Sequence, residues 1–243
     1  MQQLTRLTML SVLLALLFAL NGGSANAEGR HLAIYRVTIQ NLTHGQPFSP
    51  PVAATHHRGI RMFKVGKLAS DELAAIAQDG NEVPMFNLFK NSDKVTDVVD
   101  VGRPLTPSGR VVATFTDSVT FEIKAAPGDH FSLATMLICT NDGVLGLNAV
   151  RLPHSGSAVH YLNGYDAGRE NNTEKSIDIV DPCSTLGPFP LAGDPNGNRD
   201  AAVATIPPQV IHLHPGIKGV GDLSVAQHGW IDPVAKVTIT RVD

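Results

Sequence analysis

Two short polar segments of the chain carry closely spaced acidic side chains. The first is residues 140–143, where Asp142 precedes a glycine, and the second is residues 163–174. In the second segment Asp166 and Glu170 are four residues apart, and Gly168 between them allows the backbone to turn sharply. Such a loop can direct two carboxylates toward one point.

Carboxylates gathered at one point favour a divalent cation, which relieves their mutual repulsion. Calcium takes about six to eight oxygen ligands from carboxylates, backbone carbonyls and water. The spacing in residues 163–174 does not match the EF-hand loop. Because Asp-Gly turns and acidic loops are common, the residues alone leave calcium as one hypothesis beside an ordinary solvated turn.

Histidines offer a second kind of metal chemistry. Imidazoles that could ligate a transition metal occur at His56, His57, His154, His160, His212, His214 and His228. The pair His212 and His214 has strand spacing, which places both rings on one face. Nothing in the sequence links the separated histidines, so the simpler interpretation is surface and loop side chains without a shared site.

Signatures of catalysis are weak. The chain has no Gly-x-Ser-x-Gly elbow, no His-Glu-x-x-His motif and no phosphate-binding loop. The glycine-rich residues 216–221 lack a preceding strand and a following helix, and we expect a plain loop there. A secreted hydrolase built around Asp166 and nearby His160 stays as an alternative hypothesis.

The N-terminus predicts export. Residues 7–20 are almost entirely apolar, and Ala25-Asn26-Ala27 fits the pattern that signal peptidase cleaves. The apolar stretch is short for a membrane span, which needs about 20 residues. We therefore predict a signal peptide over residues 1–27, with an uncleaved anchor as the alternative. Residues 28–243 would form one domain without a transmembrane segment.

The charge balance argues against broad nucleic-acid binding. The formal net charge is −3, whereas a nucleic-acid surface needs a basic face. The nearest approach to a basic cluster is His56-His57-Arg58 with Arg61 and Lys64, which is thin.

Alternating and continuous apolar patterns predict mostly strands. Period-two alternation predicts half-buried strands, and a continuous apolar run predicts a strand buried on both faces at 131–139. The expected strands are residues 32–40, 119–124, 131–139, 144–152 and 234–242. One short helix is expected over residues 70–78, capped by Ser70 and followed by Gly80. Residues 45–51 and 181–199 are expected loops.

These elements predict an all-β fold, an antiparallel β-sandwich with one short helix and long end loops. The first and last strands are both clear and could pair. The strands at 131–139 and 144–152 would form a hairpin through a turn at Asn141-Asp142-Gly143, where positive φ is tolerated. The only cysteines, Cys139 and Cys183, could form a disulfide in an oxidising compartment or stay as thiols.

Several motifs together resemble the spondin N-terminal domain of animal matrix proteins and of standalone bacterial proteins. They are Tyr35-Arg-Val-Thr-Ile39, residues 131–143, Gly164-Tyr-Asp-Ala-Gly-Arg-Glu170 and residues 233–241. The similarity covers most of the chain from about Leu32, and the Tyr-Asp-Ala-Gly motif is its most specific element. The run before Asn141 is closer to the bacterial branch.

The resemblance implies a β-sandwich with a calcium ion at one end. By position, the ligands would be Asp142, Asp166 and Glu170, which stands where the animal motif usually has Asp. Glu122 is the best match to a further acidic ligand on the preceding strand. The animal relatives act in matrix adhesion and recognition.

The function expected from sequence is therefore an exported, calcium-binding recognition or adhesion module, periplasmic or extracellular. Its partner would be a protein or glycan at a cell surface or in a matrix, and not a nucleic acid. The alternatives are the secreted hydrolase and a structural cell-surface component without a discrete ligand.

Overall fold

The computed structural model describes residues 31–187 and 203–243. The signal peptide predicted over residues 1–27 lies outside the described residues, as does most of the loop expected at 181–199. No helix among the described residues is long and apolar enough to cross a membrane.

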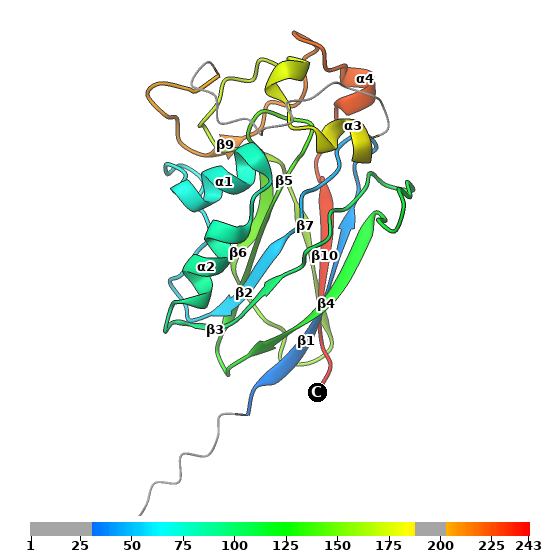
Figure 1. Cartoon of the computed structure of the whole chain (residues 1–243). Coiled ribbons are helices and arrows are strands. Elements are labelled where there is room, and N and C mark those ends of the chain that lie inside the picture. Colours follow the sequence, from blue (N-terminus) through cyan, green and yellow to red (C-terminus); the bar gives the residue numbers. More distant parts are fainter. Residues whose placement is uncertain (1–30, 188–202) are drawn as a thin grey trace, which may run out of the picture. The chain divides into compact units, whose positions relative to one another are not determined.

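Two antiparallel sheets form the body of the domain (Figure 1). The four-stranded sheet has the order β4 (Ser118–Ala125), β1 (Ala33–Asn41), β10 (Ala235–Arg241) and β7 (Ser157–Leu162). The six-stranded sheet has the order β3 (Val95–Asp100), β2 (Val52–His56), β5 (His130–Met136), β6 (Gly143–Arg151), β8 (Tyr165–Asp166) and β9 (His212–Leu213). The predicted β-sandwich is confirmed.

The first and last strands pair at the centre of the four-stranded sheet, as the sequence suggested. Val37 lies opposite Ile239, and both side chains are fully buried between the sheets. Thr38 lies opposite Thr238 on the other face. The alternation of the two strands therefore sorts apolar side chains into the core and polar ones outward.

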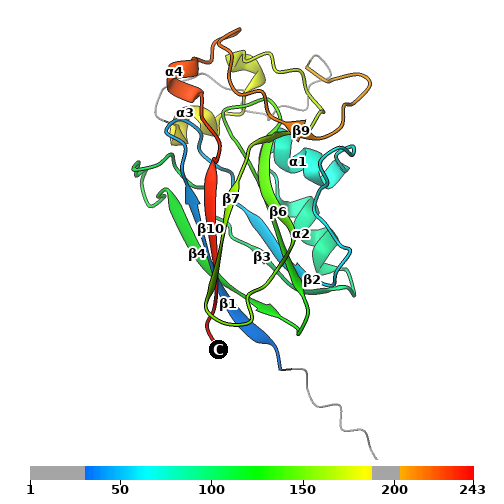
Figure 2. The same ribbon diagram turned by 180° about the vertical axis from the view of Figure 1, so that it is seen from behind.

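The six-stranded sheet is buried on both faces, which explains the continuous apolar run of β5. One face packs on the four-stranded sheet through Phe131 and Leu133. The other face packs under two helices, α1 (Asp71–Asp79) and α2 (Val83–Lys90), through Ala134 and Met136 (Figures 1 and 2). A strand covered on both sides has no polar face, so its residues do not alternate.

The expectation of a single helix is wrong. Helix α1 forms as predicted, because the Ser70 hydroxyl accepts from the Leu73 N–H and Gly80 ends the helix with a φ of 64°. Helix α2 follows at once, and its proline lies in the first turn, where a missing N–H costs nothing. Shorter helical segments are η1 (Ser176–Asp178), α3 (Pro182–Leu186), which falls in an expected loop, and α4 (Val225–His228).

The hairpin of β5 and β6 is confirmed, but the chemistry of its connection differs from the expectation. Neither Asn141, Asp142 nor Gly143 has a positive φ. The Thr140 hydroxyl instead donates to the Leu137 carbonyl and accepts from the Gly143 N–H. A side chain at Gly143 would collide with Thr140, so glycine is needed here for space and not for conformation.

Long loops gather at one end of the sandwich, together with α3, α4 and β9 (Figures 1 and 2). The short pairing of β6 with β8, and of β8 with β9, ties these loops to the six-stranded sheet. This end therefore holds most of the acidic residues singled out from the sequence.

Candidate metal centre

Strand pairing brings Asp142 and Asp166 together from positions 24 residues apart in the chain. Asp142 immediately precedes β6, and in the register of β6 with β8 its neighbour Gly143 lies opposite Asp166. The Asp142 carbonyl accepts the Ala167 N–H at 3.1 Å. The sheet therefore sets the positions of the two carboxylates, and the loops after them complete the site.

Asp142 is 0% exposed, and its two carboxylate oxygens differ in their surroundings. Oδ2 accepts the backbone N–H groups of Arg169 at 2.6 Å and Glu170 at 3.0 Å. Oδ1 is buried and accepts no hydrogen bond from a donor group. An unpartnered buried carboxylate oxygen is costly, because desolvation has removed its water without a replacement.

Asp166 is 2% exposed, and each of its oxygens accepts one hydrogen bond. Oδ1 accepts the N–H of Gly168, whose φ of 72° makes the tight turn possible. Oδ2 accepts the side-chain amide of Asn172 at 2.7 Å and lies 3.8 Å from Nε2 of His212.

Burial and the neighbouring carboxylate raise the pKa of Asp142 to about 7. Burial is the largest cause, the Asp166 charge and a side-chain hydrogen bond with Asp166 add to it, and the two N–H groups on Oδ2 oppose it. The protein thus holds two carboxyl groups together in a place where both cannot easily be ionised. A cation between them would reverse that preference.

Glu170 adjoins the pair through its backbone, while its carboxylate faces helix α1. Its N–H donates to Asp142, and its Oε1 accepts the Gln78 side-chain amide at 2.8 Å. Burial raises the pKa of Glu170 to about 9, and the Asp142 charge contributes. The structure therefore brings three of the four sequence-predicted acids close to one another, although only two of them face each other.

Glu122 is not brought to this group. It lies on β4, and its carboxylate forms a 3.1 Å salt bridge with Arg36 on the outer face of the four-stranded sheet. The match to Glu122 came from resemblance alone, and the alternation of β4 turns this side chain outward.

The two histidines with strand spacing, His212 and His214, each have a hydrogen-bond partner of their own. His214 is buried against Trp230 and accepts the Gly216 N–H on Nδ1. His212 has its Nδ1 on the Val210 carbonyl. Within residues 31–187 and 203–243, no group of three or more His, Cys, Asp or Glu side chains is placed to hold a metal ion. A cation at Asp142 and Asp166 would need other oxygens as well.

Two polar residues at this end were not singled out from the sequence. Asn172 donates its side-chain N–H to Oδ2 of Asp166, and its place in the acidic segment was the available signal. Glu174 is 3% exposed, and its carboxylate accepts the N–H groups of Lys218, Gly219 and Val220. The glycine-rich residues 216–221 are a loop, as expected, but one that encloses this carboxylate.

A serine–histidine pair exists away from this end, yet it is closed to substrate. Ser132 donates to Nε2 of His56 at 2.8 Å, and Nδ1 of His56 donates to the His57 carbonyl. Both side chains are fully buried. His160, which the hydrolase hypothesis paired with Asp166, lies on β7 of the four-stranded sheet, whereas Asp166 lies on β8 of the six-stranded sheet. Neither arrangement presents a nucleophile to solvent.

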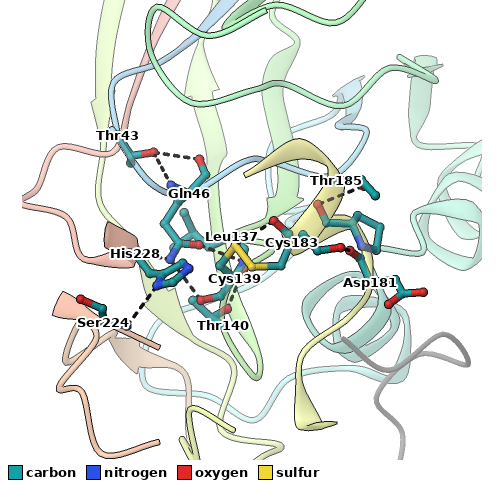
Figure 3. Close-up of a disulfide and its surroundings, with 12 residues drawn as sticks. Thr43, Gln46, Leu137, Cys139, Thr140, Asp181, Cys183, Thr185, Ser224 and His228 are labelled. Carbon is teal, nitrogen blue, oxygen red and sulfur yellow. Dashed lines mark hydrogen bonds between the residues drawn. A yellow bond between two sulfur atoms is a disulfide. The ribbon is translucent and has the colours of Figure 1, made fainter. Parts of the chain in front are cut away.

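A disulfide between Cys139 and Cys183 fixes the chain just before Asp142 (Figure 3). The Cα atoms are 5.0 Å apart, which answers the question left open by the sequence. The Gln46 side chain brackets Cys139, accepting its N–H at 3.0 Å and donating to its carbonyl at 3.1 Å (Figure 3). The backbone entering the site is therefore held on both sides.

Comparison with protein-family models places much of the chain in a known family. The family model described as Spondin_N matches residues 40–178, more than half of the 243-residue chain. The matched region contains Asp142, Asp166 and Glu170. No curated protein matches the chain.

Proposed function

The chain belongs to the spondin N-terminal domain family, and from this premise we propose that it is an exported calcium-binding module for recognition or adhesion. The observation that supports the proposal is the buried, unpartnered Oδ1 of Asp142 beside the Asp166 carboxylate. A hard cation would satisfy that oxygen and relieve the repulsion between the two carboxylates.

The donor set suits calcium better than a transition metal. Asp142 and Asp166 supply carboxylate oxygens, and Asn172 and nearby backbone carbonyls are of the kinds that calcium accepts, with water completing the shell. Zinc would favour three or four imidazole, thiolate or carboxylate side chains. Glu122 is left out of this proposal because its carboxylate is committed to Arg36.

Calcium would supply fixed positive charge at the loop end. It would link the start of β6 to the segment 166–172 and so hold the long loops in one arrangement. Loops that a rigid scaffold positions are the usual place for recognition. We therefore place the ligand surface, for a protein or glycan of a cell surface or matrix, on or beside these loops. Export follows from the signal peptide predicted over residues 1–27.

The melting temperature with and without calcium tests the site. At a calcium concentration 100 times the Kd, binding adds about 2.7 kcal/mol, which corresponds to a rise of roughly 5–10 °C in a domain of this size. Asp166→Ala should abolish the rise. The matched control Glu122→Gln, an acid that the same resemblance named, should keep it. Identical melting curves in calcium and in chelator would refute the calcium site.

The partner requires a separate measurement. Binding of the protein to arrays of glycans and matrix proteins, in calcium and in chelator, should give calcium-dependent binding to a restricted set of ligands. A calcium-stabilised protein that binds nothing would favour the structural surface component instead.

A further inference from the structure

A basic segment without acids lies between β2 and helix α1. Residues 57–68 connect β2 to the cap of α1 and contain Arg58, Arg61, Lys64 and Lys67, all of them exposed. Within the part of the chain that the structure describes, none of these four side chains has an acidic partner. In the sequence this group contains only a few basic residues. Only the structure shows that these four described cations lack an acidic partner.

Exposed aliphatic side chains accompany these cations. Val65 is 48% exposed and Leu68 is 59% exposed. Leu68 pairs with Val210 in an antiparallel bridge, so the two side chains lie next to each other, and Val210 is itself 45% exposed. The outer part of the segment therefore combines unpaired positive charge with apolar surface that the domain leaves uncovered.

The segment is firmly held, so its exposed side chains have a fixed backbone. Met62 and Phe63 insert into the core, and the Phe63 N–H donates to the Asn148 side chain at 3.0 Å. Further along, Gly66 donates to the Ile211 carbonyl, and Ile211 donates to the Lys67 carbonyl, both at 2.8 Å. Two buried side chains and three hydrogen bonds thus leave the cations and aliphatics facing solvent.

We propose that residues 57–68, with Val210, dock the protein on the surface of an anionic lipid bilayer. Each Lys or Arg near an anionic membrane is worth about 1 kcal/mol, and clusters of about four or more such residues are a mark of anionic-lipid binding. Val65, Leu68 and Val210 enter the boundary between headgroups and acyl chains. A polyanionic glycan would match the cations but would leave the aliphatic side chains in water.

This docking does not rest on the calcium site, because the lysine, arginine and aliphatic side chains that would contact the bilayer need no bound ion. The net charge of −3 gives no general attraction to an anionic surface, so binding depends on the local segment. Measurements in chelator therefore test the bilayer surface alone, without calcium bridges between the protein and lipid.

The test is co-sedimentation of the protein with vesicles in chelator at low salt. Vesicles of phosphatidylglycerol mixed with phosphatidylcholine should bind it, and vesicles of phosphatidylcholine alone should not. Lys64→Glu with Lys67→Glu should weaken binding more than tenfold. The matched control Lys124→Glu with Lys236→Glu, on the four-stranded sheet, should change binding less than twofold. Circular dichroism and melting temperature verify that each variant is folded.

Leu68→Asn separates the bilayer from a polyanion. It should weaken vesicle binding severalfold and leave retention on a heparin column unchanged, since all the cations remain. Three results would overturn the proposal: no binding to the anionic vesicles, vesicle binding that Leu68→Asn does not alter, or equal loss in the Lys124/Lys236 control. Heparin binding without vesicle binding would identify a glycan surface in its place.

Discussion

Two buried carboxylates at the loop end of this domain have opposite surroundings. Glu174 and Asp142 are almost equally inaccessible, at 3% and 0% exposed. Glu174 has both oxygens occupied by N–H groups from one loop: Oε1 accepts from Lys218 at 2.5 Å, and Oε2 accepts from Gly219 at 2.6 Å and Val220 at 2.9 Å. Asp142 has one oxygen occupied twice and the other unoccupied by any donor.

The difference separates a structural carboxylate from the one that we propose as a calcium ligand. Glu174 already obtains from the backbone what water would have given it, so it needs nothing further and organises the loop 217–220. Asp142 receives backbone N–H groups on only one of its two oxygens, and it faces the carboxylate of Asp166. Burial and acidity are therefore shared by both carboxylates, and the calcium site that we propose rests on the Asp142 oxygen that the fold leaves without a donor.

Removal of the disulfide should have the largest effect on the free energy of unfolding. It also tests whether the disulfide or the strand pairing positions Asp142. Cys139 and Cys183 are 44 residues apart, and closing such a loop stabilises by about 4 kcal/mol in the chain-entropy model. Urea unfolding of Cys139→Ala with Cys183→Ala should show that loss. The calcium response should persist, because β6–β8 pairing positions the two acids. If calcium no longer stabilised this folded variant, the bridge and not the sheet would hold the site.

Glu174→Gln should destabilise the domain by about 3 kcal/mol, because an amide presents hydrogens to N–H groups that need an acceptor. The loss should be the same in calcium and in chelator. Parallel urea titrations in the two conditions measure this. A loss that appeared only in calcium would make Glu174 part of the metal site and would remove the distinction drawn above.

Asp142→Asn should behave in the opposite way. In chelator at pH 8 we expect its unfolding free energy to rise by about 1 kcal/mol, because a neutral amide replaces a buried carboxylate that has one unpartnered oxygen. In calcium it should gain nothing, whereas the natural protein gains about 2.7 kcal/mol at 100 times the Kd. Destabilisation in chelator comparable to that of Glu174→Gln would show that Asp142 is structural.

The pH dependence of stability gives a smaller and graded effect. Asp142 and Glu170 have ordinary pKa values of 3.8 and 4.5, raised in the folded protein to about 7 and about 9. An acid whose pKa is raised on folding stabilises the folded protein fully at a pH below its ordinary pKa. This stabilisation is lost as the pH rises through the pKa of the folded state. In chelator the melting temperature should therefore fall between about pH 5 and pH 9, and calcium should reduce the fall. A melting temperature that rose across this window would contradict the raised values.

The sequence predicted the parts of this fold that depend on local pattern. Alternation identified β1, β4 and β10, and an almost continuous apolar run correctly indicated that β5 is covered on both faces. Helix α2 was missed because a proline and a short length obscured its pattern. The turn at Gly143 was misjudged because the glycine is required by a neighbouring side chain, which sequence does not show.

Only part of the candidate site could be predicted from the sequence, again because local patterns are visible there and long-range contacts are not. Asp142 and Asp166 carry the acidic motifs themselves, and their loops could be found by inspection. The outward position of Glu122 follows from the alternation of β4, whereas its partner Arg36 and the partners of Glu174 lie more than 40 residues away. Long-range packing decides which acids are satisfied, so composition and spacing could not separate Glu174 from Asp142.

Anomalous diffraction from crystals grown in calcium tests the central claim most directly. The account predicts one calcium peak about 2.3–2.6 Å from Oδ1 of Asp142 and from an oxygen of Asp166, absent in crystals of Asp142→Asn. A map with no peak between these residues at saturating calcium, or with a peak only at other acids, would contradict it.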